Sequence, residues 1–158
     1  MGRIRNVRRL SDSKGANLVE AAIITPLLLL LTLGIVDFAA MFYGYLALEH
    51  GVSQATRLAI TGQTLTGASG AMNRQESIKY RMRESTPTLT IPDAAFTFSY
   101  MAPGASSWSG GVGGPGDIGR VTVNYTWTFM TPLVRPFFSG GQVNLRVEST
   151  MKNEAVFN

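Results

Sequence analysis

The sequence contains no cysteine and a single histidine, His50. The lack of cysteine excludes disulfides, thiolate catalysis and zinc sites built on cysteine. One histidine leaves few metal or acid–base sites, because these use histidine more than any other side chain. No G-x-S-x-G elbow and no phosphate-binding Gly-Lys-Ser motif is present. We therefore expect that the protein is not an enzyme and holds no cofactor and no metal.

Charge is scarce as well, at 15% of residues, and the formal net charge of +4 comes from the N-terminus. Beyond residue 15 there are nine basic and nine acidic residues, which cancel. A nucleic-acid interface needs basic residues gathered on the folded part of a protein. We therefore expect no nucleic-acid partner. The excess positive charge resides in a short leader, at Arg3, Arg5, Arg8, Arg9 and Lys14.

A long apolar run follows this leader. Residues 21–36 carry no charge and are mostly Leu and Ile, and the stretch FAAMFYGYLAL follows Asp37. Sixteen helical residues span about 24 Å, and extending the run to Tyr45 exceeds the ~30 Å of a hydrocarbon core. The run is apolar on all sides and has no one-sided stripe, which favours a bilayer over a protein core. We predict a transmembrane segment at about 21–45, within one helix over 16–60.

The flanks of this segment set its orientation. Basic residues precede it, whereas the stretch that follows, to Gln54, carries Glu49 and no Lys or Arg. Because positive flanks stay inside, we expect a cytoplasmic N-terminus and export of the chain from about residue 50 onward.

The fate of the leader has several interpretations. A secretory signal peptide needs a small-x-small site close to the apolar run, but the first one, Gly51-Val52-Ser53, is too distant. Arg8-Arg9 invites a twin-arginine interpretation, which the long and very hydrophobic run disfavours. Two alternatives stay open: an uncleaved signal anchor, and cleavage on the cytoplasmic side between Gly15 and Ala16.

The order of these features is similar to that of a type IV prepilin: a basic leader, Gly15, four residues, Glu20 and an apolar helix. More narrowly, NLVEAAIITPLLLLLTLGIVDFAAMFY resembles the start of TadE-like pseudopilins of the tight-adherence (Tad/Flp, type IVc) pilus. These show an acidic residue, a Leu/Pro-rich stretch and then Gly-Ile-Val-Asp/Glu-Phe. VTVNYTWTFMTPL and the final KNEAV are also similar to the family. Ala21 departs from it, since an aromatic residue often follows the glutamate.

The resemblance implies a minor pilin or pseudopilin, a structural subunit of a pilus or its base. Its partners would be a prepilin peptidase that cuts after Gly15, other pilin or pseudopilin subunits, the assembly platform and the membrane. It would reside in the inner membrane and then at the pilus and cell surface. An alternative is a single-pass, membrane-anchored extracytoplasmic binding domain that does not polymerise.

The resemblance also implies a role for Glu20. Cleavage would give Ala16 an α-amino group, and Glu20 would pair with that group on an adjacent subunit and set its register. A carboxylate is costly in apolar surroundings unless it is paired. Ala16 and Glu20 are four residues apart on one helix face, so a pair within one chain is also consistent with the sequence.

Three further features lie in or near the span. Pro26 lacks an N–H and crowds the carbonyl of Ala22, which predicts a kink or local melting of the helix. Asp37 is 21 residues past Ala16, about 32 Å along a straight helix, and so lies near the outer interface. There we expect it to be solvated or to pair with another subunit. Tyr43 and Tyr45 suit an aromatic belt at the same level.

Residues 61–158 are expected to form an extracytoplasmic α+β domain with a pilin-like fold. A loop over 62–70 and a short helix over about 71–84 precede the strands. Strict alternation of apolar and polar residues predicts strands at 96–100, 121–129 and 143–147. We therefore predict an antiparallel sheet of three or more strands with its apolar face packed on helix.

The Gly-rich stretch 102–119 contains seven glycines in eighteen residues. We predict a mobile surface loop without regular structure. Trp108 within it is either a contact point for another subunit or surface, or folds back over the sheet edge.

Overall fold

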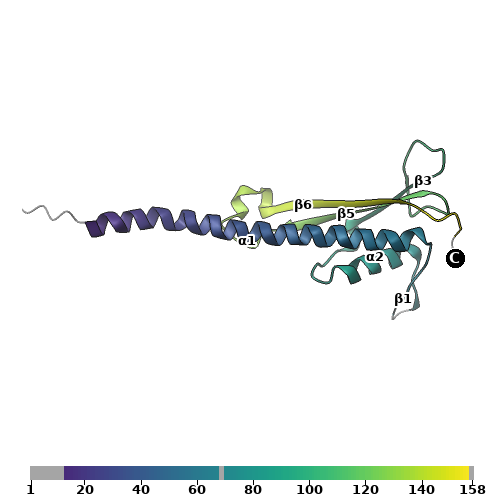
Figure 1. The fold of residues 1–158 in the computed structure, drawn as a ribbon, viewed down its shortest axis with the longest axis horizontal. Helices are drawn as coiled ribbons and strands as arrows, with labels where there is room; N and C mark the ends of the chain where they lie inside the picture. The colour runs from purple at the N-terminus through teal and green to yellow at the C-terminus, as the bar shows by residue number, and fades with distance from the viewer. Residues whose placement is uncertain (1–12, 68–69, 157–158) are drawn as a thin grey trace, which may run out of the picture.

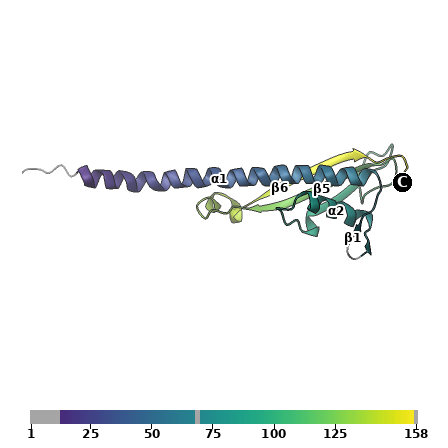
Figure 2. The ribbon, with the colours of Figure 1, turned by 60° about the horizontal axis from the view of Figure 1, so that its bottom comes forward.

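A computed structural model describes residues 13–67 and 70–156, with side chains described from Gly15 onward. One helix, α1 (Ser13–Ile60), runs for 48 residues. Figures 1 and 2 show that its N-terminal half projects alone, whereas a sheet and a second helix lie along its C-terminal half. Residues 1–12 of the predicted basic leader, with the Arg8-Arg9 pair, lie outside the described residues.

The main sheet has four antiparallel strands in the order β4-β3-β5-β6: β3 (Phe96–Met101), β4 (Ser109–Gly110), β5 (Ile118–Thr128) and β6 (Gln142–Lys152). The alternating residues share one face, as predicted. In register, Val123 lies opposite Val147 and Trp127 opposite Val143. The predicted α+β fold, a long apolar helix followed by a small antiparallel sheet domain, is confirmed.

The core lies between this sheet and the C-terminal half of α1. The helix contributes residues spaced four, three and four apart, which form one stripe: Leu48, Val52, Ala55 and Ala59. The sheet contributes Val121, Val123, Leu145 and Val147. The boundary predicted at residue 61 therefore does not divide the protein physically, because half of α1 belongs to the core of the domain.

The second helix, α2 (Arg74–Ser85), packs against α1 and begins three residues later than predicted. Gly70 and Ala71 instead pair with Thr66 and Gly67 as a small hairpin of two strands, β1 (Thr66–Gly67) and β2 (Gly70–Ala71). The helix starts at a capping box, in which Asn73 and Glu76 bond each other's backbone N–H groups. The apolar spacing alone, on which the predicted start was based, does not indicate this cap.

Gly51 allows α1 and α2 to approach closely. A Cβ atom placed on Gly51 would lie 2.5 Å from Cγ2 of Thr86 and 3.2 Å from Cγ of Met82. Thr86 is buried, and its hydroxyl donates to the carbonyl of Met82 at 2.9 Å, so it cannot rotate away freely.

We expect Gly51→Ala to destabilise the full chain by up to about 2 kcal/mol. Alanine gains about 1 kcal/mol of helix propensity, but overpacking a tight contact typically costs ~1–3 kcal/mol. Thermal unfolding in detergent measures the change. His50→Ala is the matched control, because His50 is exposed on the same turn. A gain in stability for Gly51→Ala would contradict the packing described.

Candidate functional site

The N-terminal half of α1 is an apolar surface that the rest of the chain leaves uncovered. No residue from 16 to 36 is buried, and Glu20 is the one charged residue among them. Leu27 is 66% exposed and Ile35 is 63% exposed. In the described part of the chain, α1 is the one helix long and apolar enough to cross a membrane.

Gly15, Ala16 and Glu20 lie in the first turns of α1, and Ala16 and Glu20 are exposed. Among the residues whose side chains are described, 15–67 and 70–156, no hydrogen bond or ion pair holds the carboxylate of Glu20. Cleavage after Gly15 and the register role of Glu20 stay predictions.

Pro26 lies inside α1, and the helix is continuous through it. The predicted local melting is therefore wrong, because one proline removes a single N–H and the neighbouring turns keep their hydrogen bonds. The functional use of a kink stays a prediction.

The carboxylate of Asp37 links the apolar helix to the sheet domain through hydrogen bonds. It is only 2% exposed. Its Oδ1 accepts a hydrogen bond from the N–H of Met130 at 3.0 Å, and its Oδ2 accepts one from the N–H of Thr131 at 2.9 Å. Carboxylate-to-amide bonds of this kind are stronger than neutral ones. The expected solvated position is wrong, because the chain after β5 folds back onto this turn of α1.

An aromatic cluster includes Phe38, the residue after Asp37. The ring of Phe38 meets those of Phe129 and Phe138 edge to face, with centroids 5.6 and 6.0 Å away. Phe129 and Phe138 stack at 4.3 Å. These ring contacts pack the residues that flank the β5–β6 loop against α1, one residue after Asp37.

Tyr43 and Tyr45 differ in their surroundings. Tyr43 is 65% exposed, as an interface residue would be. Tyr45 instead packs against the core, and its hydroxyl donates to Oε1 of Glu49 at 2.9 Å. Between them, Gly44 makes room for Trp127, whose ring would lie 2.6 Å from an added Cβ. Helix and sheet therefore touch at this level, which the prediction of a membrane span to residue 45 did not include.

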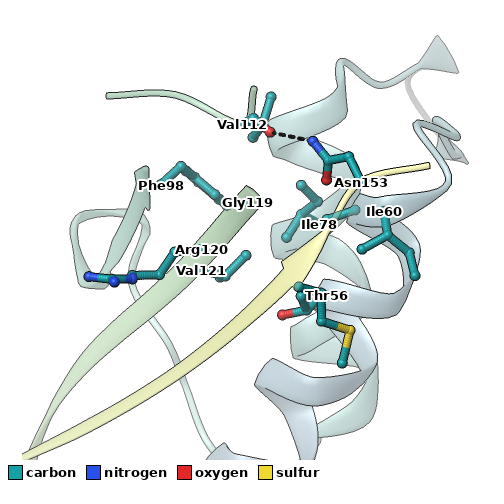
Figure 3. Close-up of a pocket in the computed structure, with 11 residues that line it drawn as sticks. Thr56, Ile60, Ile78, Phe98, Val112, Gly119, Arg120, Val121 and Asn153 are labelled. Carbon is teal, nitrogen blue, oxygen red and sulfur yellow. Dashed lines mark hydrogen bonds between the residues drawn. The ribbon is translucent and has the colours of Figure 1, made fainter. Parts of the chain in front are cut away.

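The opposite end of the domain is held by Asn153, a buried residue in the KNEAV segment. Its Nδ2 donates to the carbonyls of Gly114 at 2.8 Å and Val112 at 3.4 Å. Figure 3 shows it reaching Val112 from the end of β6, beside Gly119. A Cβ on Gly119 would come within 3.2 Å of the Asn153 side-chain oxygen, so glycine leaves room there for a close approach.

We expect Asn153→Ala to lower the free energy of unfolding by about 1–3 kcal/mol, because two part-buried carbonyls lose their donor. Amide hydrogen exchange around residues 111–119 should accelerate. Asn144→Ala, at an exposed position of β6, is the control and should leave both unchanged. Unchanged exchange in Asn153→Ala would show that the loop is held by other contacts.

The Gly-rich stretch is more ordered than predicted. Ser109 and Gly110 pair with Tyr100 and Ser99 as β4, and Ile118 and Gly119 already belong to β5. The prediction of no regular structure is therefore wrong for these residues. Its turns use glycines with positive φ, such as Gly113 at 69°.

Trp108 folds back onto the sheet, one of the two predicted alternatives. The guanidinium carbon of Arg120 lies 3.6 Å from its ring centroid, a cation–π contact. The ring remains 37% exposed.

Charged groups on α2 form a small surface network. Arg83 donates a hydrogen bond to Asp93, and Nζ of Lys79 lies 3.7 Å from Oδ1 of Asp93. The hydrogen bond from Arg83, and then the positive charges of Lys79 and Arg83, lower the pKa of Asp93. Because the pKa of Asp93 is lower in the folded state, its ionisation stabilises the fold at pH values above the ordinary pKa. This stabilisation is lost as the pH falls through the lowered pKa. The effect is small because Asp93 is 71% exposed.

Comparison with known families matches residues 15–57 to the TadE-like protein family. The match covers most of α1 and confirms the predicted resemblance over this segment. The searches of curated proteins and of solved structures gave no significant match.

Proposed function

We propose that this TadE-like chain, associated through its family with the Tad pilus, is a minor pilin or pseudopilin. In this role it is inserted in the inner membrane with its N-terminus in the cytoplasm and its sheet domain outside. A prepilin peptidase trims it after Gly15, and it then enters a pilus or the base of one at the cell surface.

The observation that carries this proposal is the uncovered half of α1. Its apolar side chains are exposed around the helix, and its single carboxylate, Glu20, has no partner within the described chain. Such a surface suits lipid first and then the helices of neighbouring subunits. An ammonium at Ala16 of a neighbour would satisfy Glu20, since a buried charge is tolerated when paired.

The proposed role is structural and involves no catalysis. Its support is the composition, with no Cys and one His, and the way the polar residues are used. Asp37 and Asn153 both bond backbone groups of their own chain. The proposed partners are the prepilin peptidase, other pilin subunits, the assembly platform and the membrane.

The alternative is an anchored domain that binds a ligand and never polymerises. An unpaired Glu20 beside an apolar surface favours assembly, because an anchor gains nothing from a charge there. Deleting the gene and restoring it tests the proposal. If the chain is a pilus subunit, piliation is lost and then restored. Normal pili without it, and its absence from sheared or membrane-bound pilus fractions, would favour the anchor.

A further inference from the structure

The loop between β5 and β6 carries apolar side chains that nothing in the described chain covers. Met130 is 73% exposed, Phe137 is 70% exposed and Leu133 is 48% exposed. They lie around two short 3₁₀ helices, η2 (Arg135–Phe137) and η3 (Ser139–Gly141). Figures 1 and 2 show this loop as the part of the domain nearest the free half of α1.

This apolar loop is continuous with the exposed surface of α1. An open groove between them is lined by Leu31, Ile35 and Phe38 from the helix and by Val134, Phe137 and Phe138 from the loop. A second open groove continues the first one along the helix. It is lined by Pro26 and Leu27 of α1 and by Leu133 and Pro136 of the loop. The loop therefore lies beside helix turns that precede Asp37.

Most backbone N–H groups of the loop are hydrogen-bonded within the chain. Six of its amide N–H groups are bonded within the chain. Those of Met130 and Thr131 donate to Asp37, and four others donate to loop carbonyls, at Val134, Arg135, Phe137 and Phe138. Pro132 and Pro136 have no N–H to satisfy. Lipid-exposed irregular backbone is excluded from the hydrocarbon region itself, so a loop bonded in this way suits the interfacial layer, where apolar side chains are buried about 5–10 Å into the boundary of headgroups and acyl chains.

The depth of the loop follows from the length of α1. Residues 16–36 span about 31 Å as a helix, enough for a ~30 Å hydrocarbon core. Asp37 then lies at the outer boundary, and the loop beside Leu31 and Ile35 lies in the interfacial layer where the headgroups meet the upper acyl chains. The one charged loop residue, Arg135, is bonded within the chain, since its Nε donates to the carbonyl of Phe129 at 2.8 Å.

We propose that residues 130–137 are a membrane foot, which inserts into the extracytoplasmic leaflet of the bilayer that α1 crosses. The foot fixes the height and tilt of the sheet domain above the membrane before assembly. The proposed occupant of the surface is lipid, because the surface continues that of the lipid-facing helix. This inference rests on membrane insertion of α1 and is independent of whether the protein enters a pilus.

The absence of cysteine makes a site-specific test direct, since each introduced cysteine is unique. The full chain with Phe137→Cys is labelled with the fluorophore NBD. It is then reconstituted in vesicles of phosphatidylethanolamine, phosphatidylglycerol and a phosphatidylcholine spin-labelled near the top of its acyl chain. Leu31→Cys is the lipid-facing reference. Gln63→Cys, exposed at the far end of the domain, is the aqueous reference.

We expect the label at residue 137 to be quenched by the spin-labelled lipid nearly as strongly as the label at residue 31. Iodide in the buffer should quench it several-fold less than the label at residue 63. Leu133→Cys should behave in the same way and guards against a local effect of the first substitution.

Lipid quenching at both loop positions no greater than at residue 63 would overturn the proposal. Iodide then distinguishes the reason. Strong iodide quenching would mean that the loop is in water. Protection from both quenchers, with disulfide-linked dimers of the unlabelled Phe137→Cys chain, would mean that a second copy covers it.

Discussion

Replacing Glu20 with alanine is expected to reduce entry of the protein into pili by about 10- to 100-fold, while membrane insertion and trimming continue. The reason is the loss of one charge-assisted contact to the amine of a neighbouring subunit. Such contacts contribute about 1.5–3 kcal/mol, and every 1.4 kcal/mol is tenfold in an equilibrium. Immunoblots of sheared pilus and membrane fractions, with the mass of the trimmed chain, measure the three steps separately.

Two matched variants separate charge from packing at this position. Glu20→Gln keeps the size of the side chain and loses the charge, so it should resemble the alanine variant. Leu18→Ala removes an exposed apolar side chain two residues away and should enter pili nearly normally. Normal assembly of Glu20→Ala would remove the register role from Glu20.

Replacing Asp37 with alanine is expected to lower the free energy of unfolding by about 3 kcal/mol. Two amides, those of Met130 and Thr131, lose their acceptor at a position where the side chain is only 2% exposed. Hydrogen bonds to charged groups contribute about 1.5–3 kcal/mol each, offset in part by releasing a buried charge. For a chain of this size we expect a Tm roughly 6–12 °C lower. Trp127, which packs near Gly44, reports the change by fluorescence in detergent.

The controls for Asp37 use the same helix. Asp37→Asn should lose nearly as much stability as Asp37→Ala. Its side-chain NH₂ group cannot accept a hydrogen bond and would face the N–H of either Met130 or Thr131. Glu49→Ala removes an exposed carboxylate bonded only by Tyr45 and should change stability by less than about 0.5 kcal/mol. A stable Asp37→Ala chain with residues 130–137 unchanged in hydrogen exchange would refute the fastening role.

Local patterns in the sequence predicted the architecture well. Apolar residues on every side of 21–36 specify a helix that needs lipid or other helices, and this half of α1 is uncovered in the structure. The alternation of Val121 and Val123 with polar residues predicts the face of β5 that contributes to the core. Both patterns depend only on near neighbours in the chain.

The role of Asp37 could not be predicted in this way. Its partners are 93 and 94 residues away, and nothing local shows that the chain after β5 returns to this turn. Asn153 was missed for the same reason, since its acceptors lie about 40 residues earlier. The sequence signals are a charged residue next to an apolar run, for Asp37, and a polar residue after a strand, for Asn153. Both signals are equally compatible with a solvent-exposed side chain.

The mass of the mature protein isolated from its host tests the central proposal most directly. Trimming after Gly15 removes the basic leader and leaves Ala16 as the first residue, with the amine that Glu20 of a neighbour would bind. We predict an intact mass and an N-terminal peptide that start at Ala16. A chain that keeps Met1 or the residues up to Gly15 in cells with working pili would contradict the proposal.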